Sequence, residues 1–110
     1  MKVTELVEKL QLKVFTASAG LENEITGGYV SDLLSDVMGH AAEGNAWLTL
    51  QNHLNVVAIA SLRELACVIL VKNIEPPADV IQKAIAEDVA ILGSSEQTFE
   101  LAGKLYSILT

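Results

Sequence analysis

The sequence predicts an α/β fold, a layered sandwich with a mostly parallel sheet of about five short strands. Short apolar runs alternate with helical patterns along the whole chain of 110 residues. One run, Ala66 to Val71, is continuously apolar and rich in β-branched residues, which is typical of a central parallel strand covered on both faces. The length suits one domain over residues 1–110, and no internal repeat or linker divides it.

The first part of the chain predicts a short helix, a strand and a polar connection. Thr4 is a candidate cap for a helix over Glu5 to Leu10, where apolar residues recur at helical spacing. Leu12 to Thr16 then has the residue types of a strand, and Ser18 to Asn23 is a polar loop.

The stretch from Ile25 to Met38 predicts a strand, a turn and a helix. Gly27 and Gly28 permit the close approach of another backbone or of a ligand. Ser31 and Asp32 follow where a side-chain oxygen would cap the helix. This junction is either a ligand-facing turn or a tight connection in a packed core.

The middle of the chain predicts another strand and two helices. Ala46 to Leu50 has alternating side chains typical of a strand. The helical pattern over Asn55 to Leu65 is apolar on nearly every side and must therefore be covered on several sides. We expect this helix to lie at a subunit interface. Pro76 and Pro77 then introduce an amphipathic helix over Ala78 to Asp88.

The last part predicts a fifth strand and a terminal helix. Val89 to Leu92 is a short apolar run, and the helix extends over about Glu96 to Leu109. Its apolar and aromatic side chains are available to pack against the sheet: Phe99, Leu101, Ala102, Leu105, Tyr106 and Leu109.

Composition and charge favour an acidic protein that associates with itself. Apolar residues make up 51% of the chain, charged residues 19%, and the mean hydropathy is +0.40. Because this apolar content is high for a small monomer, we expect a homodimer. Seven basic and 14 acidic residues give a net charge of −7, which argues against binding to nucleic acid or to an anionic membrane.

The N-terminus and the single cysteine predict a cytoplasmic protein. Met1 to Leu10 mixes lysines and glutamates into its apolar pattern, unlike a signal peptide. The longest apolar runs are too short to cross a bilayer. Cys67 has no partner for a disulfide and lies in an apolar run, as expected in a reducing compartment.

Candidate ligand-binding residues lie mainly where strands give way to helices. In open parallel sheets, ligands usually bind beyond the carboxyl ends of the strands, and helix N-termini attract phosphate or carboxylate groups. The candidates are Thr26, Gly27, Gly28, Ser31, Asp32, Gln51, His53 and Asn55. Two further junctions contain Asn73 with Glu75, and Ser94 with Ser95. The same residues would also serve simply to cap helices and to solvate loops.

No catalytic, metal-binding or cofactor-binding constellation is predicted. His53 is the most interesting titratable residue, but no carboxylate or nucleophile can be assigned to it. Asp32 and Asp36 lack the further oxygen ligands of a hard-cation site. Gly103 and Lys104 lack the rest of a P-loop, and the dinucleotide, zinc-protease and serine-hydrolase motifs are absent. An enzyme is therefore the least favoured class of function.

Several separated segments resemble a stand-alone DRTGG domain. The motif that names this family falls at residues 24–28, where Thr-Gly-Gly is present and Glu24 with Ile25 replaces the leading acidic and basic pair. The segments GGYVSDLLSDVM, WLTLQNHLNVVAIASL, CVILV and TFELAGKL agree in order over almost the full chain. The resemblance implies a fold similar to the N-terminal domain of HPr kinase/phosphorylase, in a bacterial domain that is regulatory or dimer-forming.

Two functions follow as expectations. The first is a non-catalytic regulatory domain that forms a homodimer and senses a small anionic metabolite or a nucleotide at the polar junctions. The alternative is a pure dimerisation or protein-interaction module that binds no small molecule, in which the polar segment from Gln51 to Asn55 is structural.

Overall fold

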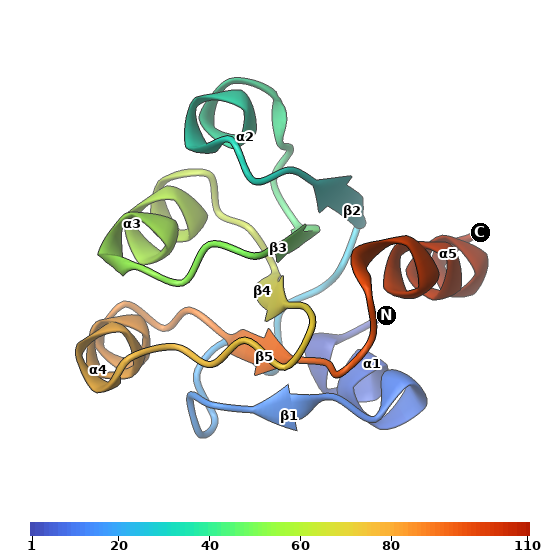
Figure 1. The fold of residues 1–110 in the computed structure, drawn as a ribbon, viewed down its shortest axis with the longest axis horizontal. Helices are drawn as coiled ribbons and strands as arrows, with labels where there is room; N and C mark the ends of the chain where they lie inside the picture. The colour runs from blue at the N-terminus through green and yellow to red at the C-terminus, as the bar shows by residue number, and fades with distance from the viewer.

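The computed structural model describes residues 1–110 and places a five-stranded sheet between two layers of helices (Figure 1). The strand order is β1-β5-β4-β3-β2. β2 to β5 run parallel to one another, and β1 pairs antiparallel with β5 at the edge. The strands are β1 Lys13–Val14, β2 Gly27–Val30, β3 Asn45–Thr49, β4 Cys67–Leu70 and β5 Ile91–Gly93. This confirms the predicted layered α/β fold with a mostly parallel sheet.

The helices cover both faces of the sheet (Figure 1). α2, α3 and α4 connect successive parallel strands on one face, while α1 and α5 lie on the other. The helices are α1 Val3–Leu10, α2 Leu34–His40, α3 Leu54–Leu62, α4 Ala78–Ala86 and α5 Thr98–Leu109. After β5, the last of the parallel strands, the chain crosses to the other face of the sheet and forms α5.

β4 lies at the centre of the sheet and is buried on both faces, as its sequence predicts. Cys67 and Ile69 pack into the cluster under α1 and α5, while Val68 and Leu70 pack into the cluster under α2, α3 and α4. Alternate side chains of one strand thus join two separate cores. No helix of the chain is both long enough and apolar enough to cross a bilayer.

Two predicted helix caps are wrong. Thr4 lies inside α1, whose cap position is Lys2; the Lys2 backbone N–H donates to the Glu5 carboxylate at 3.0 Å. α2 begins after Leu33, and the Ser31 hydroxyl accepts from the Leu33 N–H at 3.1 Å in a local turn. In both places the backbone N–H of the residue just before the helix donates to a nearby side-chain oxygen, which belongs to Glu5 at α1 and to Ser31 at α2.

The structure shows which sides of α3 and α5 the chain itself covers. α3 lies between α2 and α4, and Ala60 is only 2% exposed, because the chain itself covers the middle of this apolar helix. On α5, Leu101 and Leu105 face the sheet, whereas Phe99 and Tyr106 are 86% and 72% exposed. Phe99 and Tyr106 are therefore exposed, although the sequence pattern predicted that both could pack against the sheet.

Substituting Ala60 with Glu should unfold the chain and should not merely separate subunits. The variant would bury an unpaired charge in the core, so we expect it to lower the free energy of unfolding by about 3 kcal/mol or more. Ala58→Glu, on the exposed side of the same helix, should change it by less than about 0.5 kcal/mol. Urea denaturation measures both, and equal effects would contradict this packing of α3.

The Cys67 thiol should be inert in the folded protein. Burial raises its pKa to about 12, and the thiolate is the reactive form. We expect an aromatic disulfide reagent at about pH 8 to label the protein only after a denaturant unfolds it. Rapid labelling of one thiol per native chain would show that β4 is not covered on both faces.

Candidate functional site

The predicted ligand-binding residues do not form one site, because they lie at opposite ends of the parallel strands. Thr26 precedes the amino end of β2, and Gly27 and Gly28 are its first two residues. Ser31 and Asp32 follow its carboxyl end, where the loop after β3 supplies Gln51 and His53 and the first turn of α3 supplies Asn55. The four residues of β2 separate the two groups by roughly 10 Å or more.

The residues at the amino end of β2 lie at the surface, where Thr26 and Gly28 are exposed and both, with Gly27, line a groove beside α5. The Thr26 hydroxyl donates to the Glu43 carbonyl at 2.8 Å, and the Thr26 N–H donates to the Gly44 carbonyl at 2.9 Å. Gly28 lies directly beneath α5, where an added Cβ would be 2.9 Å from Leu105 Cδ2. The Thr26 contacts join this segment to the loop before β3, and Gly28 permits the close approach of Leu105.

At the carboxyl end, Asp32 joins the loop after β2 to the loop after β3. Its carboxylate oxygen Oδ1 accepts from the Thr49 hydroxyl at 2.9 Å and from the Leu50 N–H at 2.7 Å. The Gln51 amide donates to the Asp32 carbonyl at 2.9 Å, and its oxygen lies 2.8 Å from His53 Nε2. These polar groups hold the two loops together and already have partners within the chain.

His53 and Asn55 are exposed to solvent, whereas Gln51 is half-buried. His53 stands at the cap position of α3 without a side-chain capping bond, and Asn55 lies exposed in the first turn. Together with Pro77 and Asp79 they line a hollow of about 320 Å³ between the starts of α3 and α4.

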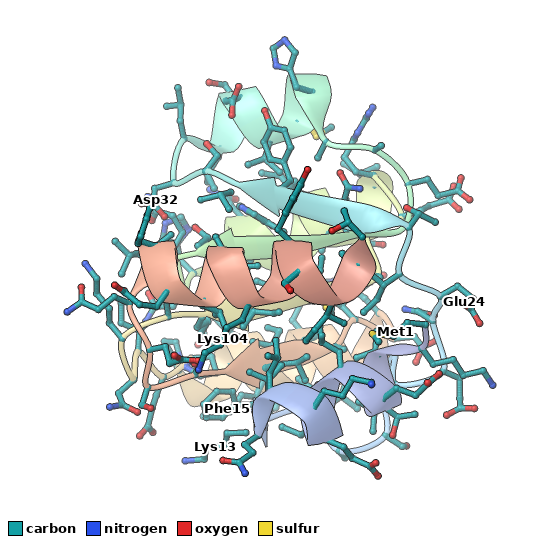
Figure 2. The ribbon with its side chains drawn as sticks, turned by 90° about the vertical axis from the view of Figure 1, so that its right-hand side faces the viewer. Met1, Lys13, Phe15, Glu24, Asp32 and Lys104 are labelled. Atoms are coloured by element: carbon teal, nitrogen blue, oxygen red, sulfur yellow. The ribbon has the colours of Figure 1, made fainter.

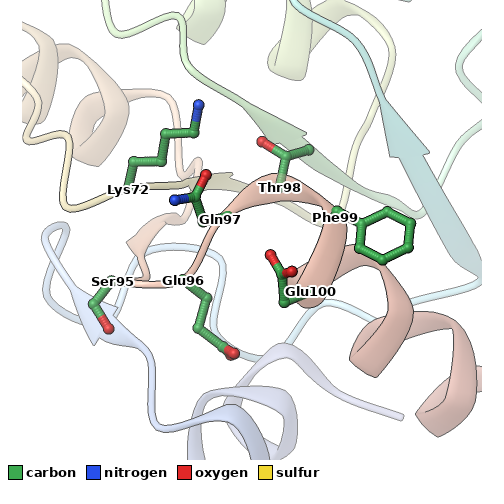
Figure 3. Close-up of a pocket in the computed structure, with 7 residues that line it drawn as sticks. All are labelled: Lys72, Ser95, Glu96, Gln97, Thr98, Phe99 and Glu100. Atoms are coloured by element: carbon green, nitrogen blue, oxygen red, sulfur yellow. The ribbon is translucent and has the colours of Figure 1, made fainter.

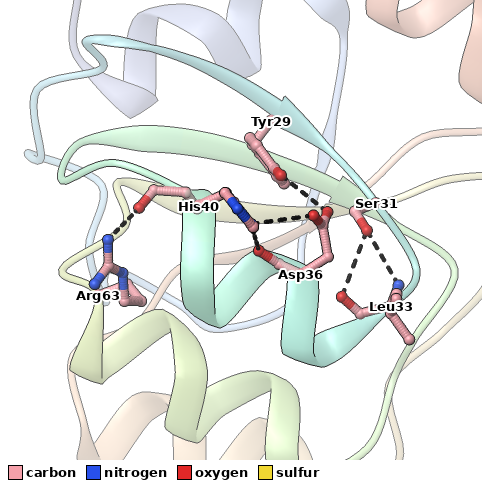
Figure 4. A network of polar contacts seen from close by, with 7 residues as sticks. Tyr29, Ser31, Leu33, Asp36, His40 and Arg63 are labelled. Atoms are coloured by element: carbon pink, nitrogen blue, oxygen red, sulfur yellow. Dashed lines mark hydrogen bonds and ion pairs between the residues drawn. The ribbon is translucent and has the colours of Figure 1, made fainter.

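A surface network lies beside this edge, on the outer side of α2 (Figure 4). The Tyr29 hydroxyl donates to Asp36 Oδ2 at 2.9 Å, and His40 Nδ1 lies 3.3 Å from Asp36 Oδ1. The hydrogen bond from Tyr29 is the main cause that lowers the pKa of Asp36, and the same bond raises the pKa of Tyr29. We assign the network to anchoring α2 against β2, because the Tyr29 hydroxyl of β2 binds the Asp36 carboxylate of α2.

A more open site lies at the carboxyl ends of β4 and β5. The chain passes from β4 to α4 on one face and from β5 to α5 on the other, which leaves a crevice between the two loops. The crevice has a volume of about 530 Å³ and is lined by Lys72, Ser95, Glu96 and the start of α5 (Figure 3). A smaller hollow of about 210 Å³, lined partly by Lys13 and Asn73, lies nearby and shares Ser95.

Backbone hydrogen bonds fix the shape of this crevice. The Lys72 N–H donates to the Glu96 carbonyl at 2.9 Å, and the Asn73 N–H donates to the Ser94 carbonyl at 2.9 Å. Lys72 and Asn73 have φ values of 58° and 61°, a left-handed conformation that is uncommon for residues other than glycine. Two such residues in succession are a local strain of the kind found at binding sites.

The crevice contains one lysine, the start of a helix and two carboxylates, of which Glu100 has no ion pair within the chain. Gln97 caps α5 without a side-chain hydrogen bond, so the first N–H groups of the helix have no acceptor within it. Figure 3 shows Lys72 beside Gln97, with the Phe99 ring directed away from both. The Glu96 carboxylate is engaged by Lys104 Nζ at 2.7 Å. Lys72 and the positive end of the helix dipole thus lie together.

The sequence analysis identified part of this crevice and missed the rest. It named Ser95, which lines the crevice, but not Lys72 or Gln97; Asn73 and Ser94, which it also named, line the neighbouring hollow. The available signal was a lysine immediately after the most apolar strand of the chain. The structure contains no group of three or more His, Cys, Asp or Glu side chains placed to hold a metal ion.

Comparison with known proteins gives a likeness of fold. No protein-family model and no curated protein matches the chain. Among solved structures, the chain is similar to the CBS and DRTGG domains of the regulatory region of Clostridium perfringens pyrophosphatase, complexed with its activator diadenosine tetraphosphate. The TM-score is 0.68 at 11% sequence identity, over 96% of this chain and 45% of the other. The likeness therefore shows a shared fold across nearly all of this chain.

Removing the Tyr29 hydroxyl should raise the pKa of Asp36. The hydrogen bond from Tyr29 lowers the pKa of Asp36 from its ordinary value, so the contribution of Asp36 to stability is present above the unfolded pKa and is lost as the pH falls through the folded value. In Tyr29→Phe we expect the carboxyl resonance of Asp36 to titrate at higher pH by carbon-13 NMR. Tyr106→Phe is the control, and an unchanged Asp36 titration in Tyr29→Phe would contradict the assignment.

Proposed function

We propose that this protein is a non-catalytic regulatory domain that acts as a cytoplasmic homodimer and senses a small anionic metabolite or a nucleotide. The observation that carries the proposal is the crevice between the loops after β4 and β5, with Lys72 beside the uncapped start of α5. A phosphate group would accept hydrogen bonds from the N–H groups of Thr98 and Phe99 and would pair with the Lys72 ammonium.

Two physical arguments support this location for a ligand. Ligands of open α/β sheets bind beyond the carboxyl ends of the strands, at the point where connections leave to opposite faces. That point here is the junction of β4 and β5. The volume of about 530 Å³ also falls in the range of small-molecule sites. Local hydrogen-bond donors can thus attract an anion although the chain as a whole carries a charge of −7.

The comparison supports a regulatory role over a catalytic one. The similar structure is a regulatory region in complex with a nucleotide activator. Together with the resemblance of the sequence to DRTGG domains, it favours a DRTGG-like regulatory domain. Diadenosine tetraphosphate is therefore the first ligand to test, since it carries several phosphates and two nucleobases.

The alternative function is a dimerisation or protein-interaction module without a small-molecule ligand. It is favoured by the polar side chains after β2 and β3, because Asp32 and Gln51 are engaged in hydrogen bonds that join one loop to another. It is also favoured by the exposed aromatic side chains of α5. A measurement of ligand binding distinguishes the two functions, because only the regulatory domain binds a small molecule.

Titration calorimetry with diadenosine tetraphosphate, ATP and inorganic phosphate tests the proposal. We expect saturable binding by at least one of them, and Lys72→Ala should weaken it by about tenfold because a charged contact is lost. Lys9→Ala, which removes the same charge from α1, should leave the affinity unchanged. His53→Ala tests the hollow at the start of α3, the second location for this class of ligand.

The outcomes separate the two functions clearly. Loss of affinity in Lys72→Ala alone supports the crevice, while loss in His53→Ala alone moves the site to the start of α3. No heat and no rise of the unfolding midpoint with any phosphate compound would contradict the sensor. At about 100 times its dissociation constant, a ligand adds about 2.7 kcal/mol, which raises the midpoint by several degrees.

A further inference from the structure

The edge of the sheet at β2 and the outer side of α5 form one uncovered apolar surface. Phe99 and Tyr106 on α5 are 86% and 72% exposed, and Val30 on β2 is 50% exposed. A groove of about 940 Å³ runs along Gly28, Val30 and the length of α5. Figure 2 views this side, with α5 across the front and β2 behind and above it. β2 pairs only with β3, so its outer backbone edge has no strand partner.

The residues of α5 on this surface form a symmetric pattern. Ala102 and Gly103 are adjacent small residues. Phe99 lies three positions before Ala102, and Tyr106 lies three positions after Gly103. Residues three and four apart share one face of a helix. If a second α5 packs antiparallel about a two-fold axis through the small pair, Phe99 of each copy lies level with Tyr106 of the other.

Gly103 has no structural purpose within the single chain. An added Cβ at this position would meet no atom within 4 Å, and its φ is not positive. Glycine inside a helix lowers helix stability, and no contact within the single chain requires it here. A small residue at the crossing point allows two helix backbones to approach closely.

The charges of this surface also suit a second copy of the same chain. A net charge of −7 makes two copies repel each other over most of their surface. The groove contains only Glu100 and Lys104 as charged residues, one of each sign. Lys104 is paired with Glu96, while Glu100 forms no ion pair within its chain. In the antiparallel arrangement, Glu100 of one copy lies on the same flank as Lys104 of the other.

We propose that a second copy of this chain docks on this surface, with the two α5 helices antiparallel and crossing at Ala102 and Gly103. The inference rests on the homodimer of the proposed function and identifies its interface. A two-fold dimer requires each patch to complement itself, which the order aromatic, small, small, aromatic provides. Phe99 and Glu100 line both this surface and the crevice, and the Phe99 ring is directed away from Lys72 (Figure 3).

A bulky residue at the crossing point should separate the subunits without unfolding them. Gly103→Gln faces open space in the single chain, so we expect the circular dichroism of the wild type. We expect the dimer dissociation constant, from sedimentation velocity, to rise by at least about tenfold because the helices can no longer approach. Gly39→Gln is the matched control, since Gly39 lies in α2 with equally empty surroundings, and it should not change association.

A pair of charge variants tests the register of the two helices. Phe99→Glu and Tyr106→Lys should each weaken the homodimer by at least about tenfold, because each sets a charge against an aromatic ring that has lost its partner. When the two variants are mixed, the carboxylate introduced at position 99 of one chain lies level with the ammonium group introduced at position 106 of the other. With one variant labelled with nitrogen-15, native mass spectrometry should therefore detect the heterodimer in excess of both homodimers.

The results distinguish failure of this interface from failure of the homodimer. A wild-type dimer that Gly103→Gln and both charge variants leave intact would overturn the α5 surface while the homodimer stands. Mixed variants that fail to form heterodimers would overturn the antiparallel register. A wild-type chain that stays monomeric up to near-millimolar concentration would overturn both the interface and the homodimer of the proposed function.

Discussion

The burial of β4 on both faces is the constraint on which the rest of the structure depends. Its alternate side chains join two separate cores, so helices must cover both sides of the sheet. Three helices on one face come from the connections between successive parallel strands, and the chain must then cross to the other face after β5 to supply α5. That crossing separates the loops after β4 and β5, and the crevice beside Lys72 is its direct consequence.

The fold could be predicted because its main signals are local in sequence. A continuous apolar run marks β4, a proline pair precedes α4, and the spacing of the apolar runs fixes the alternation of strands and helices. The helix ends and the site depend on contacts between distant residues, which a single sequence does not reveal. Asp32 precedes a helical pattern and resembles a cap, but its carboxylate binds Thr49 and Leu50 across the neighbouring loop.

The orientation of α5 illustrates the same limit. Its apolar residues occupy two sides of the helix, so periodicity cannot decide whether Leu101 and Leu105 or Phe99 and Tyr106 face the sheet. Gly28 suits the observed placement, because an added Cβ there would lie 2.9 Å from Leu105 Cδ2. The aromatic pair is thereby left on the outside. Both the proposed ligand crevice and the proposed subunit interface are thus consequences of how this one helix is placed.

The central claim is that phosphate groups bind at the start of α5, and amide chemical shifts test it most directly. In a titration of nitrogen-15-labelled protein with diadenosine tetraphosphate, the account predicts saturable shifts that are largest for Lys72 and for the backbone amides of Thr98, Phe99 and Glu100. Shifts confined to the start of α3 would place the ligand elsewhere. A spectrum that does not change at any ligand concentration would contradict the claim that this domain senses a nucleotide of this kind.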